Sequence, residues 1–239
     1  MKHRILVVAD TQFPFEHKDY LAFVKAVHKK YKCNEVIHIG DMVDAYNWTT
    51  FETEPDAPSS IDEIRKLKKT FKQWGKVFPT MKCLVGNHEE RLVKQLARAG
   101  FPKTFIGLDN VLTRLGKPPG WSLHTQIVKD NSPRGDIFFI HGHQRGLSRI
   151  PTKSNAHFNG SLVRGHHHTQ SFVAYKSTRE HLAFDMVVGS GIDQHAVAFQ
   201  YARADISRPV LSCAVIIDGV PQIIPMGLRP DGKGWKGRL

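Results

Sequence analysis

The sequence predicts an α/β fold built on two sheets, and three features of its pattern indicate this. In the first half, short apolar runs alternate with stretches whose apolar residues recur at helical spacing, an order typical of a largely parallel sheet. In the second half, strand-like segments dominate, with Asp218-Gly219 as a hairpin signal. Neither an internal repeat nor a low-complexity linker interrupts the chain. We therefore expect a single domain over residues 1–239, with a second, antiparallel sheet packed on the first.

Each predicted element has its own local pattern. Four short apolar runs predict buried strands at residues 4–9, 35–39, 82–85 and 137–140. Helices are predicted between or after them, at residues 20–31, 61–76, 89–99 and 109–115. Later strands are predicted at residues 161–164, 171–176, 182–188, 211–217 and 222–225. Residues 49–60 and 129–136 are expected to be loops, and the basic, Gly-rich tail 227–239 is expected to be flexible in part.

Composition indicates a basic, globular chain. Of the 239 residues 41% are hydrophobic, which excludes disorder, and the formal net charge of +12 favours polyanionic partners. No window approaches the roughly 20 apolar residues of a membrane span, and the apolar run before Asp10 is too short for a secretory signal. Cys33, Cys83 and Cys213 lie far apart and outside any CxxC motif, so we expect free thiols and a cytoplasmic protein. Nothing in the sequence indicates a membrane or an obligate protein partner.

Five polar clusters follow predicted strands, at the edge where open α/β sheets bind ligands. They are Asp10-Thr11-Gln12, Gly40-Asp41-Met42-Val43-Asp44, Gly86-Asn87-His88-Glu89, His141-Gly142-His143 and Gly165-His166-His167-His168. Their Asp, Asn and His side chains supply oxygen and imidazole ligands without thiolates, a set that suits Mn²⁺, Zn²⁺ or iron. Glycine beside a ligand lets the backbone and a metal approach closely. The sequence therefore predicts a metal site at this edge.

In order and spacing, these clusters resemble the motifs of the calcineurin-like binuclear metallophosphoesterases. That pattern is DxH, GDxxD, GNH followed by an acid, a lone His, and GHxH; four of the five blocks match in full between Asp10 and His168. The resemblance implies a four-layer α/β/β/α sandwich, in which helices flank two mixed sheets. The segment Phe13-Pro14-Phe15-Glu16-His17 also looks like phage-encoded members of the superfamily, which would place the protein in the cytoplasm of a host cell.

The resemblance implies a role for each polar residue. Asp10, Gln12 and His168 would bind a first metal, Asp41 would bridge to the second, and Asn87, His141 and His166 would complete it. Two cations that share a carboxylate make a bridging water acidic near neutral pH, and the resulting hydroxide attacks phosphorus in line. His88 would donate a proton to the leaving group or stabilise charge, oriented by Asp44. His143 and His167 are candidate substrate-binding residues around the ligands. Arg91 could clamp a phosphate or, more simply, pair with a carboxylate on its helix.

Gln12 departs from the family pattern, which has His at this position. A carboxamide oxygen is a harder and weaker ligand than imidazole, so Gln12 could favour Mn²⁺ and loosen the first metal, or leave this position without a metal contact. We expect two divalent cations, Mn²⁺ in the first place, with Zn²⁺ or iron as alternatives. A similar Asp-x-Gln start occurs in a Mn²⁺-dependent branch of the superfamily that hydrolyses ADP-ribose and CDP-alcohols.

Several functions remain open. A nuclease acting on phosphodiesters of DNA or RNA is favoured by the charge and by the resemblance to phage proteins. A phosphatase is disfavoured because Ala45 stands where the Ser/Thr protein phosphatases have an Arg. Gln12 favours a small nucleotide phosphodiesterase or diphosphatase. A catalytically weak binding scaffold would make Gln12 a first lost ligand. The basic helix 65–76 and the tail are candidate nucleic-acid contacts, although a solvated helix face and a disordered end are simpler explanations.

Overall fold

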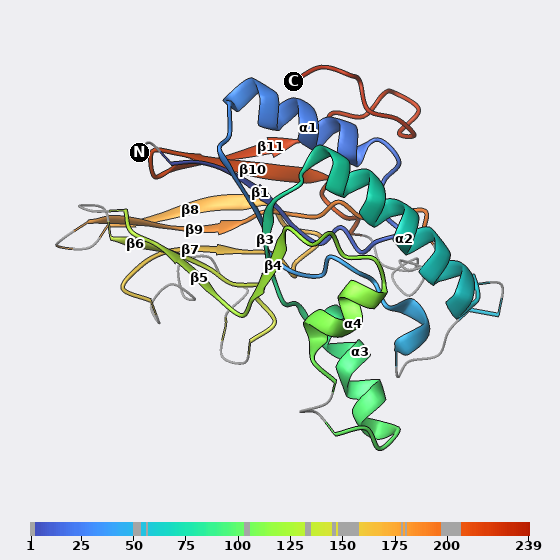
Figure 1. Ribbon diagram of the computed structural model, residues 1–239. Helices are drawn as coiled ribbons and strands as arrows, with labels where there is room; N and C mark the ends of the chain where they lie inside the picture. The colour runs from blue at the N-terminus through green and yellow to red at the C-terminus, as the bar shows by residue number, and fades with distance from the viewer. Residues whose placement is uncertain are drawn as a thin grey trace.

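Two sheets lie face to face in the computed structural model (Figure 1). The structure describes residues 3–49, 54–55, 57–102, 106–131, 135–144, 147, 158–177, 179, 181–196 and 207–239. The six-stranded sheet has the order β11 (Val220–Pro225), β10 (Ser212–Ile217), β1 (Arg4–Val8), β2 (Glu35–His38), β3 (Met81–Leu84) and β4 (Trp121–His124). The five-stranded sheet has the order β5 (Ile127–Lys129), β6 (Asp136–Phe139), β7 (Gly160–Arg164), β9 (Leu182–Val187) and β8 (Phe172–Ser177).

Parallel pairing brings the carboxyl ends of several strands to one edge. Strands β1 to β4 are parallel to one another, and so are β6, β7 and β9, while the outer strands β10, β11, β5 and β8 pair antiparallel. Parallel neighbours need a crossover. It is supplied by α1 (Tyr20–Tyr31), by the short 3₁₀ helix η1 (Tyr46–Trp48) with α2 (Ser60–Val77), and by α3 (Asn87–Arg98) with α4 (Leu108–Arg114). The loops that carry the polar clusters therefore converge.

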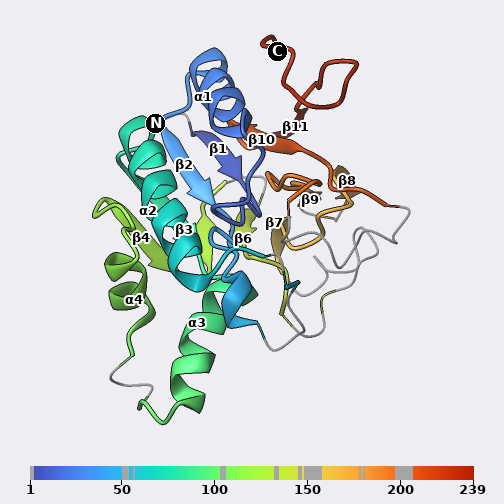
Figure 2. The same ribbon diagram turned by 90° about the vertical axis from the view of Figure 1, so that its right-hand side faces the viewer.

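The alternation of side chains along the strands divides the core into two layers. Ile5 and Val7 of β1 face the second sheet, where they pack with Phe139 and Met186. Leu6 and Val8 face the other way and pack against α1 and α2 through residues such as Phe23, Phe71 and Trp74. Figure 2 shows α1 and α2 side by side on this outer face of the six-stranded sheet.

The two-sheet α/β fold is confirmed, with two differences in detail. Strands β4 and β5 were not predicted, because their segments are short and carry few apolar residues. Among the described residues, no helix covers the outer face of the five-stranded sheet, so the expected fourth layer is not part of what the structure describes. The Asp218-Gly219 hairpin is confirmed, with both residues at positive φ, 51° and 79°. Of the predicted loop 49–60, residues 50–53 and 56 lie outside the described residues, and α2 begins at its last residue, Ser60.

The tail, expected to be flexible in part, has a packed position over residues 228–235. Leu228 forms an antiparallel bridge with Trp235. The Trp235 backbone N–H donates to Asp19 Oδ2 at 2.9 Å, and its ring meets Phe23 edge to face, with 5.8 Å between centroids. The three cysteines are buried free thiols, as expected. Over the described ranges, no helix has both the length and the apolar character needed to cross a bilayer.

Candidate metal centre

The polar clusters meet because their backbone turns sharply at the ends of the strands. Asp10, Gln12, Asp41 and His166 all adopt left-handed φ angles, of 46°, 48°, 49° and 67°. Non-glycine residues rarely adopt this conformation, and when they do they cluster at functional sites. Here the turns aim side chains from separate loops into one small space.

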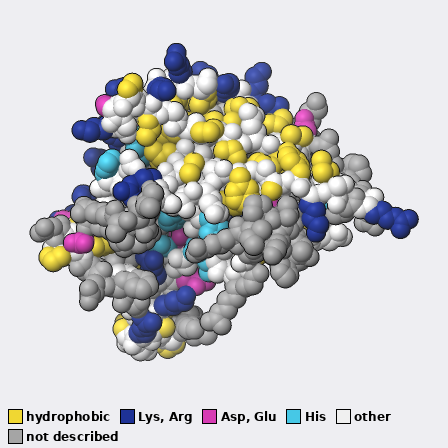
Figure 3. All heavy atoms as spheres, turned by 180° about the vertical axis from the view of Figure 1, so that it is seen from behind, with side chains coloured by type: hydrophobic (Ala, Val, Ile, Leu, Met, Phe, Trp, Pro, Cys, Tyr) yellow, Lys and Arg dark blue, Asp and Glu magenta, His cyan; other side chains and the backbone are white. Residues whose placement is uncertain are grey.

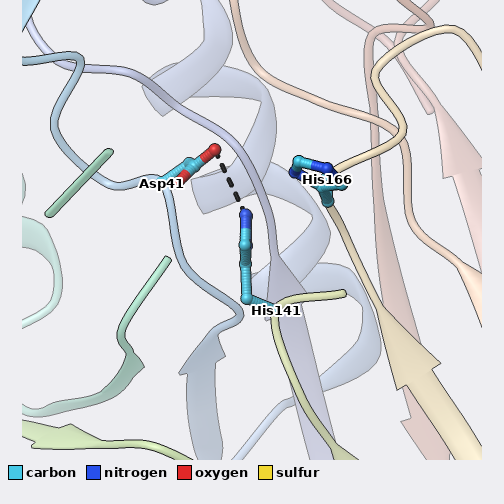
Figure 4. Close-up of side chains that lie close together, drawn as sticks. All are labelled: Asp41, His141 and His166. Atoms are coloured by element: carbon cyan, nitrogen blue, oxygen red, sulfur yellow. Dashed lines mark ion pairs between the residues drawn. The ribbon is translucent and has the colours of Figure 1, made fainter. Parts of the chain in front are cut away.

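Two groups of candidate metal ligands share one carboxylate. Asp41, His141 and His166 form one group and Asp10, Asp41 and His168 the other, with the ligand atoms of each group within 4.8 Å of one another. Figure 4 shows the first group: the Asp41 carboxylate and the His141 imidazole point at each other, and His166 faces the same space from another loop. A carboxylate common to two groups is the arrangement that a two-metal site requires.

The distances fit ligands of a common cation. Asp41 Oδ2 lies 3.2 Å from His141 Nε2, which is also 3.2 Å from Asn87 Oδ1, and His168 Nε2 lies 3.1 Å from Asp10 Oδ1. Two ligands held at about 2.1 Å from one ion lie roughly 3 Å apart. Asp41 Oδ2 is also buried without a hydrogen bond from any described residue, and an orphaned carboxylate oxygen of this kind suits a cation. The donor set therefore fits two divalent metals.

Glycines make room for the ligands. A Cβ atom on Gly86 would lie 2.2 Å from Asp41 Oδ1, and one on Gly165 would lie 2.3 Å from Asp10 Oδ2. At Gly40 it would lie 2.6 Å from His141 Nδ1, and the backbone there has φ +98°. The glycines of the three motifs are thus needed for the space beside each ligand.

The buried ligands form a strongly coupled charge cluster. Burial favours a neutral Asp41, but His141 and His88 outweigh it and hold the pKa of the carboxyl well below its usual range. Burial likewise opposes a charge on His141, yet Asp41 raises its pKa to about 10. Burial and then His141 lower the pKa of His166 to about 4. A metal ion at this position has to displace the proton on His141, so metal binding is coupled to proton release.

Comparison with known proteins agrees with this geometry. The sequence model of the family called calcineurin-like phosphoesterase matches residues 3–190. The chain belongs to the calcineurin-like phosphoesterase family. It is therefore a metal-dependent phosphoesterase, of a family that works with two metals.

Individual relatives are distant. The Gene 54 protein of Mycobacterium phage L5 is 25% identical over 274 aligned positions, which cover 99% of this chain and all of that protein. Among solved structures, Vps29 of Chaetomium thermophilum has a TM-score of 0.50 at 12% identity, covering 96% of this chain and 92% of that one. YfcE, a phosphoesterase from E. coli, has a TM-score of 0.45 at 13% identity, covering 93% and 92%. At such identities the likeness to Vps29 shows the fold alone.

His88 of the phosphoesterase lies beside the ligand groups and belongs to neither. Its Nδ1 is 2.7 Å from the carbonyl oxygen of Asp44 and 3.3 Å from Asp44 Oδ1. A carbonyl can only accept, so Nδ1 carries the hydrogen and Nε2 faces the metal centre, 3.7 Å from Asp41 Oδ2. Asp44 therefore contacts His88 through both its carboxylate and its backbone, and the backbone contact is the shorter. Burial opposes a charge on His88, yet Asp41 and Asp44 raise its pKa to about 9.

Gln12 and Arg91 both reach the free nitrogen of His88. The buried Gln12 places its Nε2 atom 3.4 Å from His88 Nε2 and 3.4 Å from His168 Nε2, and so lies between the two imidazoles. Arg91 Nη2 lies 3.0 Å from His88 Nε2, and Nη1 lies 3.4 Å from the Asp44 carbonyl oxygen. The simpler of the two expectations was an ion pair between Arg91 and a carboxylate of α3. Among the described residues, no such ion pair is present. Because the guanidinium can only donate, its contact with Nε2 belongs to the form of His88 that carries no hydrogen on that atom.

His143 and His167 line the outside of the ligand groups. The His143 ring centroid lies 5.2 Å from that of His141, and its Nε2 lies 3.5 Å from Glu90 Oε1. The His167 ring centroid lies 5.3 Å from that of His166. Neither histidine belongs to a ligand group, which is consistent with the expected position around the ligands.

Glu89 supports the loops of the candidate site, a role that the sequence analysis did not assign to it. Its fully buried carboxylate accepts the backbone N–H groups of Asp41, Val43 and Gly86 at 3.0, 2.9 and 2.7 Å. It therefore ties the loop after β2 to the loop after β3. Burial, followed by Asp41, raises its pKa to about 7. The available signal was its position three residues after Gly86, where an acidic residue caps a helix.

Proposed function

We propose that this phosphoesterase is a nuclease that hydrolyses phosphodiester bonds in DNA or RNA, with Mn²⁺ as the preferred metal. The observation that carries the proposal is the formal net charge of +12 on a chain with a phosphoester-cleaving centre, because a polyphosphate substrate is drawn to such a charge. Ala45, buried and only a methyl group in size, offers no donor to a phosphomonoester dianion, which disfavours a phosphatase. The free thiols support a reducing compartment, the cytoplasm of a host cell.

We assign the ligands as the two groups suggest. Asp10, Asp41 and His168 would hold one cation, and Asp41, His141 and His166 would hold the other. Gln12 beside His168 and Asn87 beside His141 would complete the two sets through their amide oxygens. When bound, the two cations supply Lewis-acid activation of water and of the phosphoryl oxygens at neutral pH.

The protein's own part in the reaction falls to His88, Asp44 and Arg91. Because the Asp44 carbonyl holds the hydrogen on Nδ1, the atom that exchanges a proton with the leaving oxygen is His88 Nε2. The Asp41 and Asp44 carboxylates raise the pKa of His88. Asp44 belongs to neither ligand group, so its charge would still favour a proton on His88 with metal bound. Arg91, released when Nε2 is protonated, is free to bind a non-bridging phosphoryl oxygen with its planar fork of donors.

A single hydrolysis panel with Mn²⁺ tests the proposal. It compares double-stranded DNA, single-stranded DNA, RNA, bis-p-nitrophenyl phosphate and p-nitrophenyl phosphate, with Asp41→Asn as the inactive control. We expect cleavage of polynucleotide and diester, and less than about a tenth of wild-type turnover in Asp41→Asn, since the shared ligand is weakened. Arg91→Ala should raise KM, and Arg91→Lys should restore it in part. Cleavage of the small esters alone would refute the nuclease and favour a nucleotide-sized substrate, the class to which Gln12 points.

A further inference from the structure

We propose that the exposed side of α1 and α2 is a docking surface for the phosphate backbone of a nucleic-acid duplex, an inference that rests on the proposed nuclease function. We refer to it as the basic helix surface. From α1 and its C-cap it contains Lys25, Lys29, Lys30 and Lys32, and from α2 it contains Arg65, Lys66, Lys68, Lys69, Lys72 and Lys76. All ten side chains are exposed.

The two helices present these cations together because they pack next to each other. The ring centroids of Tyr20 on α1 and Trp74 on α2 are 6.3 Å apart, and those of His28 and Phe78, the C-cap of α2, are 5.5 Å apart. Both helices bury their apolar faces on the six-stranded sheet and turn the lysines outward. Figure 3 shows the molecule from behind, where the centre is largely hydrophobic and Lys and Arg side chains lie mainly at the margins.

The charge of this surface is strongly one-sided. Residues 20–32 and 60–77 together contain ten Lys and Arg and two carboxylates, which gives +8 of the net +12 of the whole chain. Of the two carboxylates, Glu63 is buried and only Asp62 is exposed. On this surface, the one ion pair among the described residues joins Arg65 to Asp62 at 3.2 Å. Within the described part of the chain, the other nine cations form no ion pair with an acidic side chain.

The surface is also connected to the metal centre. Arg65, Lys69, Lys72 and Lys76 recur at steps of three and four, so they form a stripe along α2 of about 16 Å. At the first turn of α2, Glu63 accepts the backbone N–H groups of Tyr46 and Asn47 at 3.0 and 3.2 Å. Those residues follow Asp44 almost directly in the chain. A polynucleotide that lies along the stripe therefore leads toward the site where its phosphodiester is cleaved.

The chemistry of the surface favours a duplex over other polyanions. Single strands are held by bases that stack on exposed aromatic rings, but the aromatic side chains of α2 are buried, as are Tyr20 and Phe23 of α1. Tyr31 of α1 is partly buried, and Lys30 Nζ lies 5.8 Å from the centroid of its ring. A helix that binds an anionic membrane inserts its apolar face, but here those faces are already packed on the sheet. Exposed cations without exposed rings suit the regular phosphates of a double helix.

Charge reversal tests the surface directly. The variant Lys69→Glu/Lys72→Glu is compared with Arg114→Glu/Lys176→Glu, which makes the same change in net charge at exposed positions on α4 and β8. Binding of short duplex DNA and duplex RNA is followed by fluorescence anisotropy in the Asp41→Asn background, which leaves the probe intact, across a salt series. Hydrolysis of bis-p-nitrophenyl phosphate is measured without Asp41→Asn.

We expect the α2 variant to weaken duplex binding at least about tenfold and to reduce the slope of log affinity against log salt by about 2, since each lost phosphate contact removes roughly one unit. Its hydrolysis of the small diester and the binding of the control should stay unchanged. Unaltered duplex binding in the α2 variant would refute the proposed docking surface. Cleavage of DNA by the wild type would still support the proposed nuclease function. If the wild type neither binds nor cleaves polynucleotides, both proposals fail. Tighter binding of the wild type to phosphatidylserine vesicles than to duplexes would also refute the proposed docking surface.

Discussion

Replacing Gly86 by alanine is expected to disable the metal centre through one added methyl group. The new Cβ would lie 2.2 Å from Asp41 Oδ1 and 2.5 Å from Asp41 N. Gly86 has φ −99°, which alanine adopts freely, so the backbone contributes no strain and the clash alone decides the effect. Since ordinary contacts begin at 3.4 Å, the shared carboxylate has to move by about 1 Å.

The size of this displacement sets the expected loss. A misplacement of about 1 Å at a reacting centre costs about 10²-fold in rate. We therefore expect kcat/KM for bis-p-nitrophenyl phosphate with Mn²⁺ to fall about 10²-fold, and the bound metal, measured by elemental analysis, to fall below two ions per chain. Gly227→Ala is the matched control, because its Cβ would meet nothing closer than Lys236 Cδ at 3.6 Å.

Retention of both metals and of more than about half the activity in Gly86→Ala would refute the reasoning, because the shared ligand would then tolerate displacement. Circular dichroism establishes that the variant is folded. Should it fail to fold, Gly165→Ala provides the same test on the other metal. Its Cβ would lie 2.3 Å from Asp10 Oδ2, and an active, fully metallated Gly165→Ala would contradict the argument equally.

Two further predictions concern His88 and Glu16. His88→Ala should lower turnover by roughly 10²–10⁴, the range for a lost acid–base group, with metal content unchanged; loss of metal would identify His88 as a ligand instead. Burial raises the pKa of Glu16 from 4.5 to about 7, and Glu16 Oε2 has no hydrogen-bond partner in the described part of the chain. The native state therefore binds this proton more tightly than the unfolded state does. The stabilisation that results is fully present below pH 4.5. As the pH rises through 7 it is lost, and the free energy of unfolding falls by on the order of 3 kcal/mol. Urea unfolding at pH 5 and pH 8 measures this loss of stability, which should be smaller in Glu16→Gln than in the wild type. An equal loss in both proteins would show that Glu16 does not cause it.

The strands that could be predicted from the sequence are those whose own apolar residues indicate that they are buried. Most residues of β1, β2 and β3 are apolar and buried, and each strand lies in a largely apolar stretch of sequence, which predicts a buried strand. By contrast, β4 is Trp121-Ser-Leu-His and β5 is three residues long. Each becomes a strand by pairing with a neighbour, β4 with β3 and β5 with β6, and such pairing at a sheet edge leaves little trace in composition.

The same division applies to the site. The motif order identified the residues that the structure brings together, because each ligand follows a strand and the strand ends coincide. The partner of Arg91 was not predictable in this way, since two neighbouring glutamates favoured an ion pair. The helix begins at Asn87, so positions 88 and 91 share one face, and the guanidinium reaches His88 instead. Side-chain partners of this kind depend on the orientation of a helix, which the sequence does not specify.

The backbone of the site explains why propensity and motif disagree there. Asp10, Gln12, Asp41, Ala45 and His166 all have positive φ, at a cost of about 1 kcal/mol or more each, where propensity alone would place glycine. Cross-loop hydrogen bonds offset this cost: the Gln12 N–H donates to the Asp41 carbonyl at 2.9 Å, and Glu89 accepts three N–H groups from two loops. The residues that metal chemistry demands are thus not those that the turns prefer. Local propensity therefore does not predict the residues at these positions, and the polar motifs are the better guide to a candidate site.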